Sequence, residues 1–113
     1  MRKKSENPMN STERKVVEAF RRLLARELEV NQLVLFGSKA RGDAAPDSDM
    51  DILVIIHKPT EDVEEYVSSC AWEAGFEHGM VIVPVVYSKD EWESGIDRAS
   101  LLARAIEMEG VPL

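Results

Sequence analysis

The chain has 113 residues and a formal net charge of −7, from 14 basic and 21 acidic side chains. This length fits one domain and is too short for two ordinary ones. The acidic balance argues against strong nucleic-acid binding by the chain alone, because such binding needs clustered lysines and arginines. The single cysteine, Cys70, excludes an intrachain disulfide and favours a cytoplasmic location. No apolar run approaches the ~20 residues that cross a bilayer, so no membrane partner is expected.

The first third of the chain predicts a helix, a strand and a short helical turn. Residues 1–9 are polar and are expected to be a disordered N-terminus. Residues 11–29 carry apolar side chains at helical spacing. Asn10 and Glu13 are three apart, as in a capping box at the start of that helix. An apolar run over 33–36 predicts a strand, and residues 38–42 predict a helical turn closed by Gly42.

The middle of the chain predicts a strand, a helix and another strand. Residues 51–56 are almost continuously apolar, so both faces of this second strand should be covered. A helix is expected over 61–74, with Gly75 as its C-terminal stop. The third strand, over 80–87, contains Pro84, which cannot donate to a ladder and indicates an edge position or a bulge.

The last quarter predicts two helices. Ser88 and Glu91 form a capping box at the start of a short one that runs through Trp92, and residues 98–109 predict the other. The whole order predicts an α/β or α+β domain, with a small sheet and helices packed on it. Trp72 and Trp92 are expected to be packing residues, and an exposed one would mark a partner surface.

Gly37 and Ser38 stand where an apolar strand gives way to a helical turn. Glycine lets the backbone approach a ligand closely, and free N–H groups at a helix start favour a phosphate. The Ser38 hydroxyl can donate to a phosphate oxygen, and Lys39 and Arg41 place two cations nearby. Alone, such a turn is more often only a turn.

Asp49 and Asp51 are two residues apart at the start of the second strand. Because side chains alternate along a strand, both carboxylates should lie on one face, roughly 7 Å apart. Paired carboxylates of this kind suit one or two hard cations, and Mg²⁺ completes such sites with water and substrate phosphate oxygens. Solvated turn residues are the alternative for an isolated Asp-x-Asp.

Taken together, the two motifs resemble a known family signature. Gly37-Ser38, ten residues, then Asp49-Met50-Asp51 is similar to the signature of the DNA polymerase β-like nucleotidyltransferase superfamily, and residues 33–56 look like its minimal nucleotidyltransferase branch. The resemblance implies a small mixed β-sheet flanked by helices, with residues 10–113 as a single domain. It also implies Mg²⁺-dependent transfer of a nucleoside monophosphate, AMP first among them, from a nucleoside triphosphate to a hydroxyl, with release of pyrophosphate.

The resemblance also implies roles for individual residues and a partner. By position, Gly37 and Ser38 would hold the triphosphate, with ATP as the first expectation, and Lys39 and Arg41 would neutralise phosphate charge. Asp49 and Asp51 would bind Mg²⁺ and act in catalysis. Minimal members are commonly paired with a helical HEPN protein in toxin–antitoxin modules, and some antitoxins add AMP to that partner. A domain this small, with apolar residues left for an interface, can also form a homodimer.

One departure from the family pattern keeps a second interpretation open. Active members usually carry a third carboxylate on the next strand, but residues 80–87 contain no acid; Glu77 precedes them and Asp90 follows them. The chain is therefore either a catalytic nucleotidyltransferase or a non-catalytic module that binds nucleotide or a protein partner. A sugar-nucleotide glycosyltransferase ranks last, because its fold needs a much longer chain.

Overall fold

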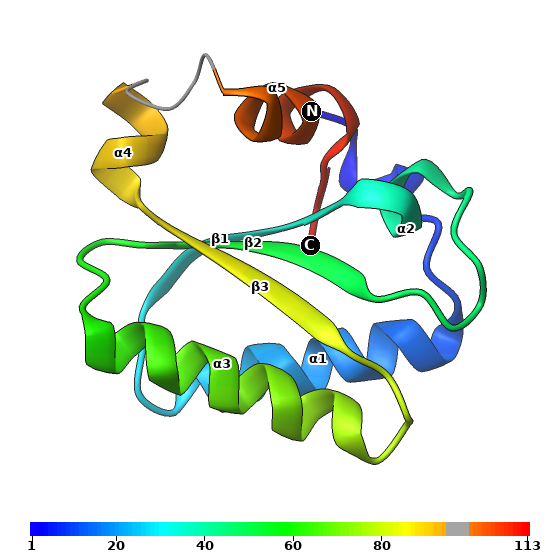
Figure 1. The fold of residues 1–113 in the computed structure, drawn as a ribbon, viewed down its shortest axis with the longest axis horizontal. Coiled ribbons are helices and arrows are strands. Elements are labelled where there is room, and N and C mark those ends of the chain that lie inside the picture. Colours follow the sequence, from blue (N-terminus) through cyan, green and yellow to red (C-terminus); the bar gives the residue numbers. More distant parts are fainter. Residues whose placement is uncertain (95–99) are drawn as a thin grey trace.

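The computed structural model describes residues 1–94 and 100–113. A four-stranded sheet in the order β3-β2-β1-β4 forms its centre. Helices α1 and α3 cover one face of the sheet, and α2, α4 and α5 lie on the other side (Figure 1). In chain order the elements are η1 (Lys4–Glu6), α1 (Ser11–Ala25), β1 (Val30–Phe36), α2 (Gly37–Arg41), β2 (Met50–Ile56), α3 (Glu61–Phe76), β3 (Ile82–Ser88), α4 (Lys89–Ser94), α5 (Leu101–Glu109) and β4 (Val111–Pro112).

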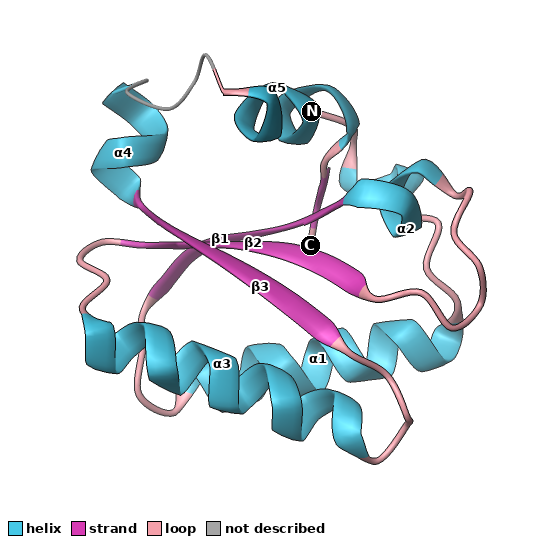
Figure 2. Ribbon diagram, viewed as in Figure 1, coloured by secondary structure: helices cyan, strands magenta, loops and turns pink. Residues whose placement is uncertain are grey.

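The sheet is mixed, as the family resemblance implied. Strand β1 pairs antiparallel with both β2 and β4, whereas β2 and β3 run parallel (Figure 2). The central strand β2 is buried from Ile52 to Ile56, which confirms that both of its faces are covered. Two apolar clusters result, one beneath α1 and α3 and a smaller one beneath α5 that contains Leu53, Ile55 and Ile106.

Helix α1 begins as the sequence predicts and ends earlier. Asn10 accepts a hydrogen bond from the Glu13 amide at 2.8 Å, and Glu13 accepts one from the Asn10 amide at 2.9 Å, which confirms the capping box. The helix ends at Ala25 instead of residue 29. Leu28 still packs against the core, but from the turn that leads into β1. Strand β1 accordingly begins at Val30, three residues before the apolar run that predicted it.

Gly75 lies inside α3 and does not stop it, so that prediction was wrong. The helix continues to Phe76, and a Cβ atom on Gly75 would lie 2.1 Å from the carbonyl oxygen of Met80. The Met80 amide donates to the Gly75 carbonyl at 3.0 Å. Glycine is needed here because the chain returns toward β3 in contact with the helix backbone.

Strand β3 is an edge strand, which confirms the inference from Pro84. It spans Ile82–Ser88, two residues later than predicted at its start and one residue longer at its end. The amide of Met50 donates to the Val81 carbonyl, so Val81 and alternate residues after it turn their backbone toward β2. Pro84 therefore faces the free edge, where it has no ladder bond to donate and hinders pairing with another strand.

The C-terminal end of the chain pairs with β1, and the N-terminal end lies beside β4. The two-residue strand β4, which the sequence analysis missed, pairs Val111 with Leu35. Residues 1–9, expected to be disordered, follow a defined path here: Arg2 donates to the carbonyls of Gly110 and Ala40, and Met9 is buried in the core. The capping box of α4 at Ser88 and Glu91 is present, as predicted. Helix α5 begins at Leu101; residues 98 and 99, where it was predicted to start, lie outside the described residues. No helix in the described ranges is long and apolar enough to span a membrane.

Candidate active site

The Gly-Ser turn and the Asp-x-Asp pair meet at one point, where β1 ends and β2 begins. The antiparallel register places Phe36 opposite Asp51, so the next residue, Gly37, lies against that carboxylate. A Cβ atom on Gly37 would lie 2.3 Å from Asp51 Oδ2. Gly37 also has a φ of 75°, a left-handed conformation that favours glycine. The turn is therefore shaped around the carboxylate, and only a residue without a side chain fits there.

Asp51 is the second residue of β2, and Asp49 lies immediately before the strand begins at Met50. Met50, between them, points into the core beneath α1 and α3 and is only 1% exposed. Asp51 lies on the opposite face, in line with Leu53 and Ile55. Burial raises the pKa of Asp51, the nearby charge of Asp49 raises it further, and Arg41 partly offsets both effects. The two carboxylates are thus close enough to repel each other.

This carboxylate pair fits a divalent cation. Mg²⁺ binds few protein carboxylates and completes its octahedron with water and substrate phosphate oxygens. A bound cation would also relieve the repulsion that disfavours ionised Asp51. Among residues 1–94 and 100–113, no group of three or more His, Cys, Asp or Glu side chains is arranged to hold a metal. The described site therefore offers two carboxylates and leaves further ligand positions to other molecules.

Val83 occupies the position beside Asp51 on the neighbouring strand. The parallel register of β2 and β3 pairs Asp51 with Val83, so the two side chains lie on the same face. Val83 is 38% exposed. A third carboxylate on β3 would reach the site from this position, and the chain has an apolar, uncharged residue there.

Arg41 is placed at the site by α2 and is already paired. Its guanidinium donates to Asp43 at 3.2 Å and to Glu109 of α5 at 3.1 Å. These hydrogen bonds, the one to Glu109 first, raise the pKa of Arg41. Arg41 also lowers the pKa of Asp51, so its charge acts at the candidate metal site. The side chain is exposed at the mouth of the site, where it can exchange these partners for a phosphate.

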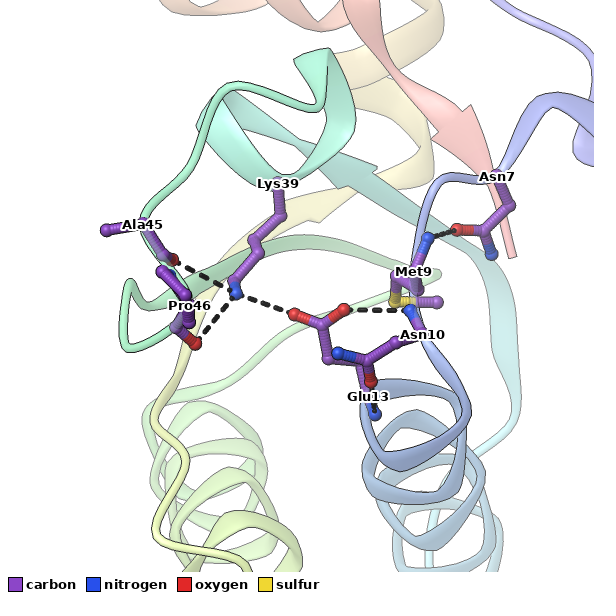
Figure 3. A network of polar contacts seen from close by, with 7 residues as sticks. All are labelled: Asn7, Met9, Asn10, Glu13, Lys39, Ala45 and Pro46. Atoms are coloured by element: carbon purple, nitrogen blue, oxygen red, sulfur yellow. Dashed lines mark hydrogen bonds and ion pairs between the residues drawn. The ribbon is translucent and has the colours of Figure 1, made fainter.

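Lys39 points away from the aspartates and holds the loop that precedes them. Its ammonium group forms a 2.6 Å ion pair with Glu13 of α1, and both side chains are almost completely buried. The same group donates to the carbonyls of Ala45 and Pro46 (Figure 3). Burial alone would raise the pKa of Glu13, but hydrogen bonds from Lys39 and from the Asn10 amide outweigh it and lower that pKa.

Ser38 and the residues that the sequence analysis missed complete the site. Ser38 is half-buried at the start of α2, and its carbonyl accepts the amides of Gly42 and Asp43, which closes the turn. Glu13 was expected only as a capping residue of α1, and Glu109 was not singled out from sequence. Their partners lie 26 and 68 positions away along the chain, so no local pattern could reveal them.

Comparison with known proteins agrees with this geometry. The model of the family described as nucleotidyltransferase domain matches residues 13–108. A protein of Methanocaldococcus jannaschii, named as a candidate protein adenylyltransferase, is 31% identical over 70 residues, which cover 61% of this chain and 71% of that protein.

Two solved structures share the fold. One, described as a candidate minimal nucleotidyltransferase, superposes with a TM-score of 0.61 at 28% identity and covers 90% of this chain and 93% of its own. The other, described as a toxin–antitoxin with AMP-PNP, has a TM-score of 0.60 at 18% identity and covers 84% of this chain and 69% of its own. Because the family match spans most of the chain and includes the Gly-Ser turn and both aspartates, the chain belongs to the nucleotidyltransferase domain family.

Proposed function

We propose that the chain is a Mg²⁺-dependent nucleotidyltransferase that transfers AMP from ATP to a hydroxyl group of a protein. The observation that carries this proposal is the contact between Gly37 and Asp51, which brings the turn suited to a triphosphate against the carboxylates suited to Mg²⁺. The M. jannaschii relative, named as a candidate protein adenylyltransferase, supports both the AMP group and a protein acceptor.

The proposed roles follow from the position of each residue. Gly37 and Ser38 hold the triphosphate through backbone N–H groups and the Ser38 hydroxyl. Asp49 and Asp51 hold Mg²⁺, which supplies positive charge to the triphosphate and the departing pyrophosphate when it is bound. Arg41 adds a cation at the mouth of the site. We assign Lys39 to the loop contact with Ala45 and Pro46, since its charge is already paired with Glu13.

The reaction forms one bond and breaks one. The acceptor oxygen bonds to the α-phosphorus, the bond from that phosphorus to the bridging oxygen breaks, and pyrophosphate leaves. The acceptor hydroxyl must also lose its proton. That proton passes to water, since Asp49 and Asp51 are both assigned to Mg²⁺ in this proposal.

The acceptor is proposed to be a helical protein of the HEPN type, with this chain as the antitoxin of the pair. The toxin–antitoxin structure with AMP-PNP supports this assignment at the level of fold. The described residues form a single domain around one sheet, and in this proposal the hydroxyl comes from a second protein. Its net charge of −7 suits a protein partner better than a nucleic acid.

A non-catalytic binding module is the second candidate function, favoured by Val83. Without a carboxylate at that position the site has two acidic ligands, which can suffice to bind Mg²⁺ with a nucleotide and still be too few for turnover. This candidate predicts nucleotide binding without release of pyrophosphate.

Label transfer separates the two candidates. The chain and a copurifying helical partner are incubated with Mg²⁺ and ATP labelled at either the α- or the γ-phosphate. Transfer predicts that label enters the partner from α-labelled ATP alone, with one pyrophosphate released per AMP added, and that Asp51→Asn abolishes both. Binding of ATP with no label transferred would support the non-catalytic module, and label transferred from the γ-phosphate would contradict nucleotidyl transfer.

A further inference from the structure

The outer surface of α1 and α3 carries opposite charges on its two halves. The two helices run antiparallel beneath the sheet, with the Tyr66 hydroxyl donating to the Leu23 carbonyl (Figure 1). Helix α3 contains five acidic residues and no basic one. The cations of α1 and its C-cap outnumber the single exposed acid, Glu18; they are Arg14, Lys15, Arg21, Arg22 and Arg26.

Two of these charges oppose the dipole of their own helix. Glu73 lies in the last turn of α3 and Glu77 is its C-cap, both at the negative end of that helix. Each such placement costs a helix a few tenths of a kcal/mol or more, roughly, so local helix stability does not explain them. In the described residues no ion pair joins α1 to α3. Among the residues that the structure describes, Arg14, Arg21 and Arg22 bond only within their own segment, so the charges of the two helices are left to a molecule that covers this face.

A large apolar pair lies beside the acidic half. Trp72 and Phe76 are one helical turn apart on α3, are 68% and 65% exposed, and have their ring centroids 5.5 Å apart. The sequence analysis expected Trp72 to be buried, and that was wrong. Exposed aromatic side chains of this size in mutual contact are typical of interface anchors. A groove between the two helices is lined by Ala19, Leu23 and Ala74 together with charged residues of both helices.

We propose that this face is the interface of a homodimer, in which α1 of each copy lies across α3 of the other. A basic partner would match α3 and meet repulsion from α1, whereas a second copy satisfies both halves at once. A two-fold axis along the helices brings every α1 onto an α3, and such isologous contacts close without forming a fibre. A standard interface hides about 800 Å² per partner, roughly one eighth of the 6719 Å² surface of this chain.

The proposed interface leaves the candidate active site open. The Asp pair lies on the opposite side of the sheet from α1 and α3, so a dimer of this kind presents two sites facing outward. The inference does not depend on catalysis and can fail or hold independently of the proposed function.

A charge-swap experiment tests the pairing of α1 with α3. One variant carries Glu73→Lys and Glu77→Lys, which places cations at the C-terminal end of α3, and another carries Lys15→Glu and Arg22→Glu, which places acids on the exposed face of α1. All four residues are exposed, so both variants should fold, as circular dichroism will check. We expect sedimentation velocity to show a dimer for the wild type, monomers for each variant alone, and a 1:1 heterodimer when the variants are mixed.

A second pair of variants tests the apolar anchor. Trp72→Ala with Phe76→Ala is expected to raise the dimer dissociation constant by about tenfold or more. The matched control, Leu101→Ala with Met108→Ala, removes two side chains that are 86% and 78% exposed on α5, and should leave the constant unchanged. A wild type that stays monomeric at about 100 µM, or a dimer that neither the charge swap nor the aromatic variant weakens, would overturn the proposal.

Discussion

Replacing Gly37 by alanine should destroy the candidate metal site while leaving the fold intact. Two effects act at this residue. The φ of 75° is a left-handed conformation that costs an alanine about 1–2 kcal/mol. In addition, the new Cβ would lie 2.3 Å from Asp51 Oδ2, so the carboxylate or the turn has to move. Displacement of the Asp51 carboxylate should remove Mg²⁺-dependent ATP binding.

Gly42→Ala separates the two effects. Gly42 has a φ of 81°, so alanine meets the same left-handed penalty, but no heavy atom lies within 4 Å of its new Cβ. Both variants should therefore lose about 1–2 kcal/mol in the free energy of unfolding. Gly37→Ala should lose more free energy of unfolding than Gly42→Ala if the turn cannot relax around the displaced Asp51 carboxylate. Of the two variants, only Gly37→Ala should lose ATP binding.

Urea denaturation and calorimetric titration of ATP with Mg²⁺ measure the two quantities on the same preparations. The steric argument predicts a folded Gly37→Ala protein that does not bind ATP, beside a Gly42→Ala protein of similar or greater stability that does. If Gly37→Ala bound ATP like the wild type, the close approach of the turn to Asp51 would not matter for function. Equal loss of binding in both variants would point to α2 as a whole, and not to the contact.

Three further variants test the surroundings of the site. Asp51→Asn should raise the free energy of unfolding of the metal-free protein at pH 7, because the folded state disfavours ionised Asp51. This gain should shrink as the pH falls through the raised folded pKa of Asp51 toward 3.8. A loss of stability at pH 7 would contradict the burial argument. Val83→Asp should raise Mg²⁺ affinity by about tenfold, because it adds a ligand charge beside Asp51; weaker Mg²⁺ binding in calorimetry would show that position 83 does not face the metal. Lys39→Met should lower the free energy of unfolding by about 3–5 kcal/mol, because it leaves buried Glu13 unpaired. Adding Glu13→Gln should restore most of that stability in urea melts, although the contacts of Lys39 with Ala45 and Pro46 remain absent. Because the pKa of Glu13 is lowered, the wild-type ion pair should stabilise the protein fully above pH 4.5 and lose its effect as the pH falls below that value, a dependence that the double variant lacks.

Local rules predicted the parts of the fold that local interactions decide. The capping box at Asn10 and Glu13 depends only on residues three apart, and both of its hydrogen bonds are present. Pro84 indicated an edge strand because a missing donor is tolerated only there. The continuous apolar character of β2 indicated a strand covered on both faces.

Long-range contacts decided what the sequence analysis missed. Gly75 carries the ordinary sign of a helix stop, but the close approach of Met80 requires glycine inside the helix. Strand β4 has only two residues and exists because β1 offers a free edge. The ion pair of Lys39 with Glu13 joins two helices 26 positions apart in the chain, so the residues around Ser38 could not reveal it.

The candidate site also combines features that the sequence could predict with features that depend on long-range contacts. Gly37 and Asp51 meet because the antiparallel register of β1 and β2 brings them together, and Asp49 is near enough for its charge to raise the pKa of Asp51. The ten-residue spacing of the motif is the sequence signal of that register. The neighbour of Asp51 on β3 could not be identified from sequence, because the pairing of Val83 depends on where the parallel strand begins.

The most direct test of the account is calorimetric titration of ATP into the purified protein, with and without Mg²⁺, beside the Asp49→Ala/Asp51→Ala variant. The account predicts that the wild type binds ATP only when Mg²⁺ is present, and that the variant stays folded and does not bind. ATP binding that is independent of Mg²⁺, or that survives in the variant, would contradict a nucleotide site built on these two carboxylates.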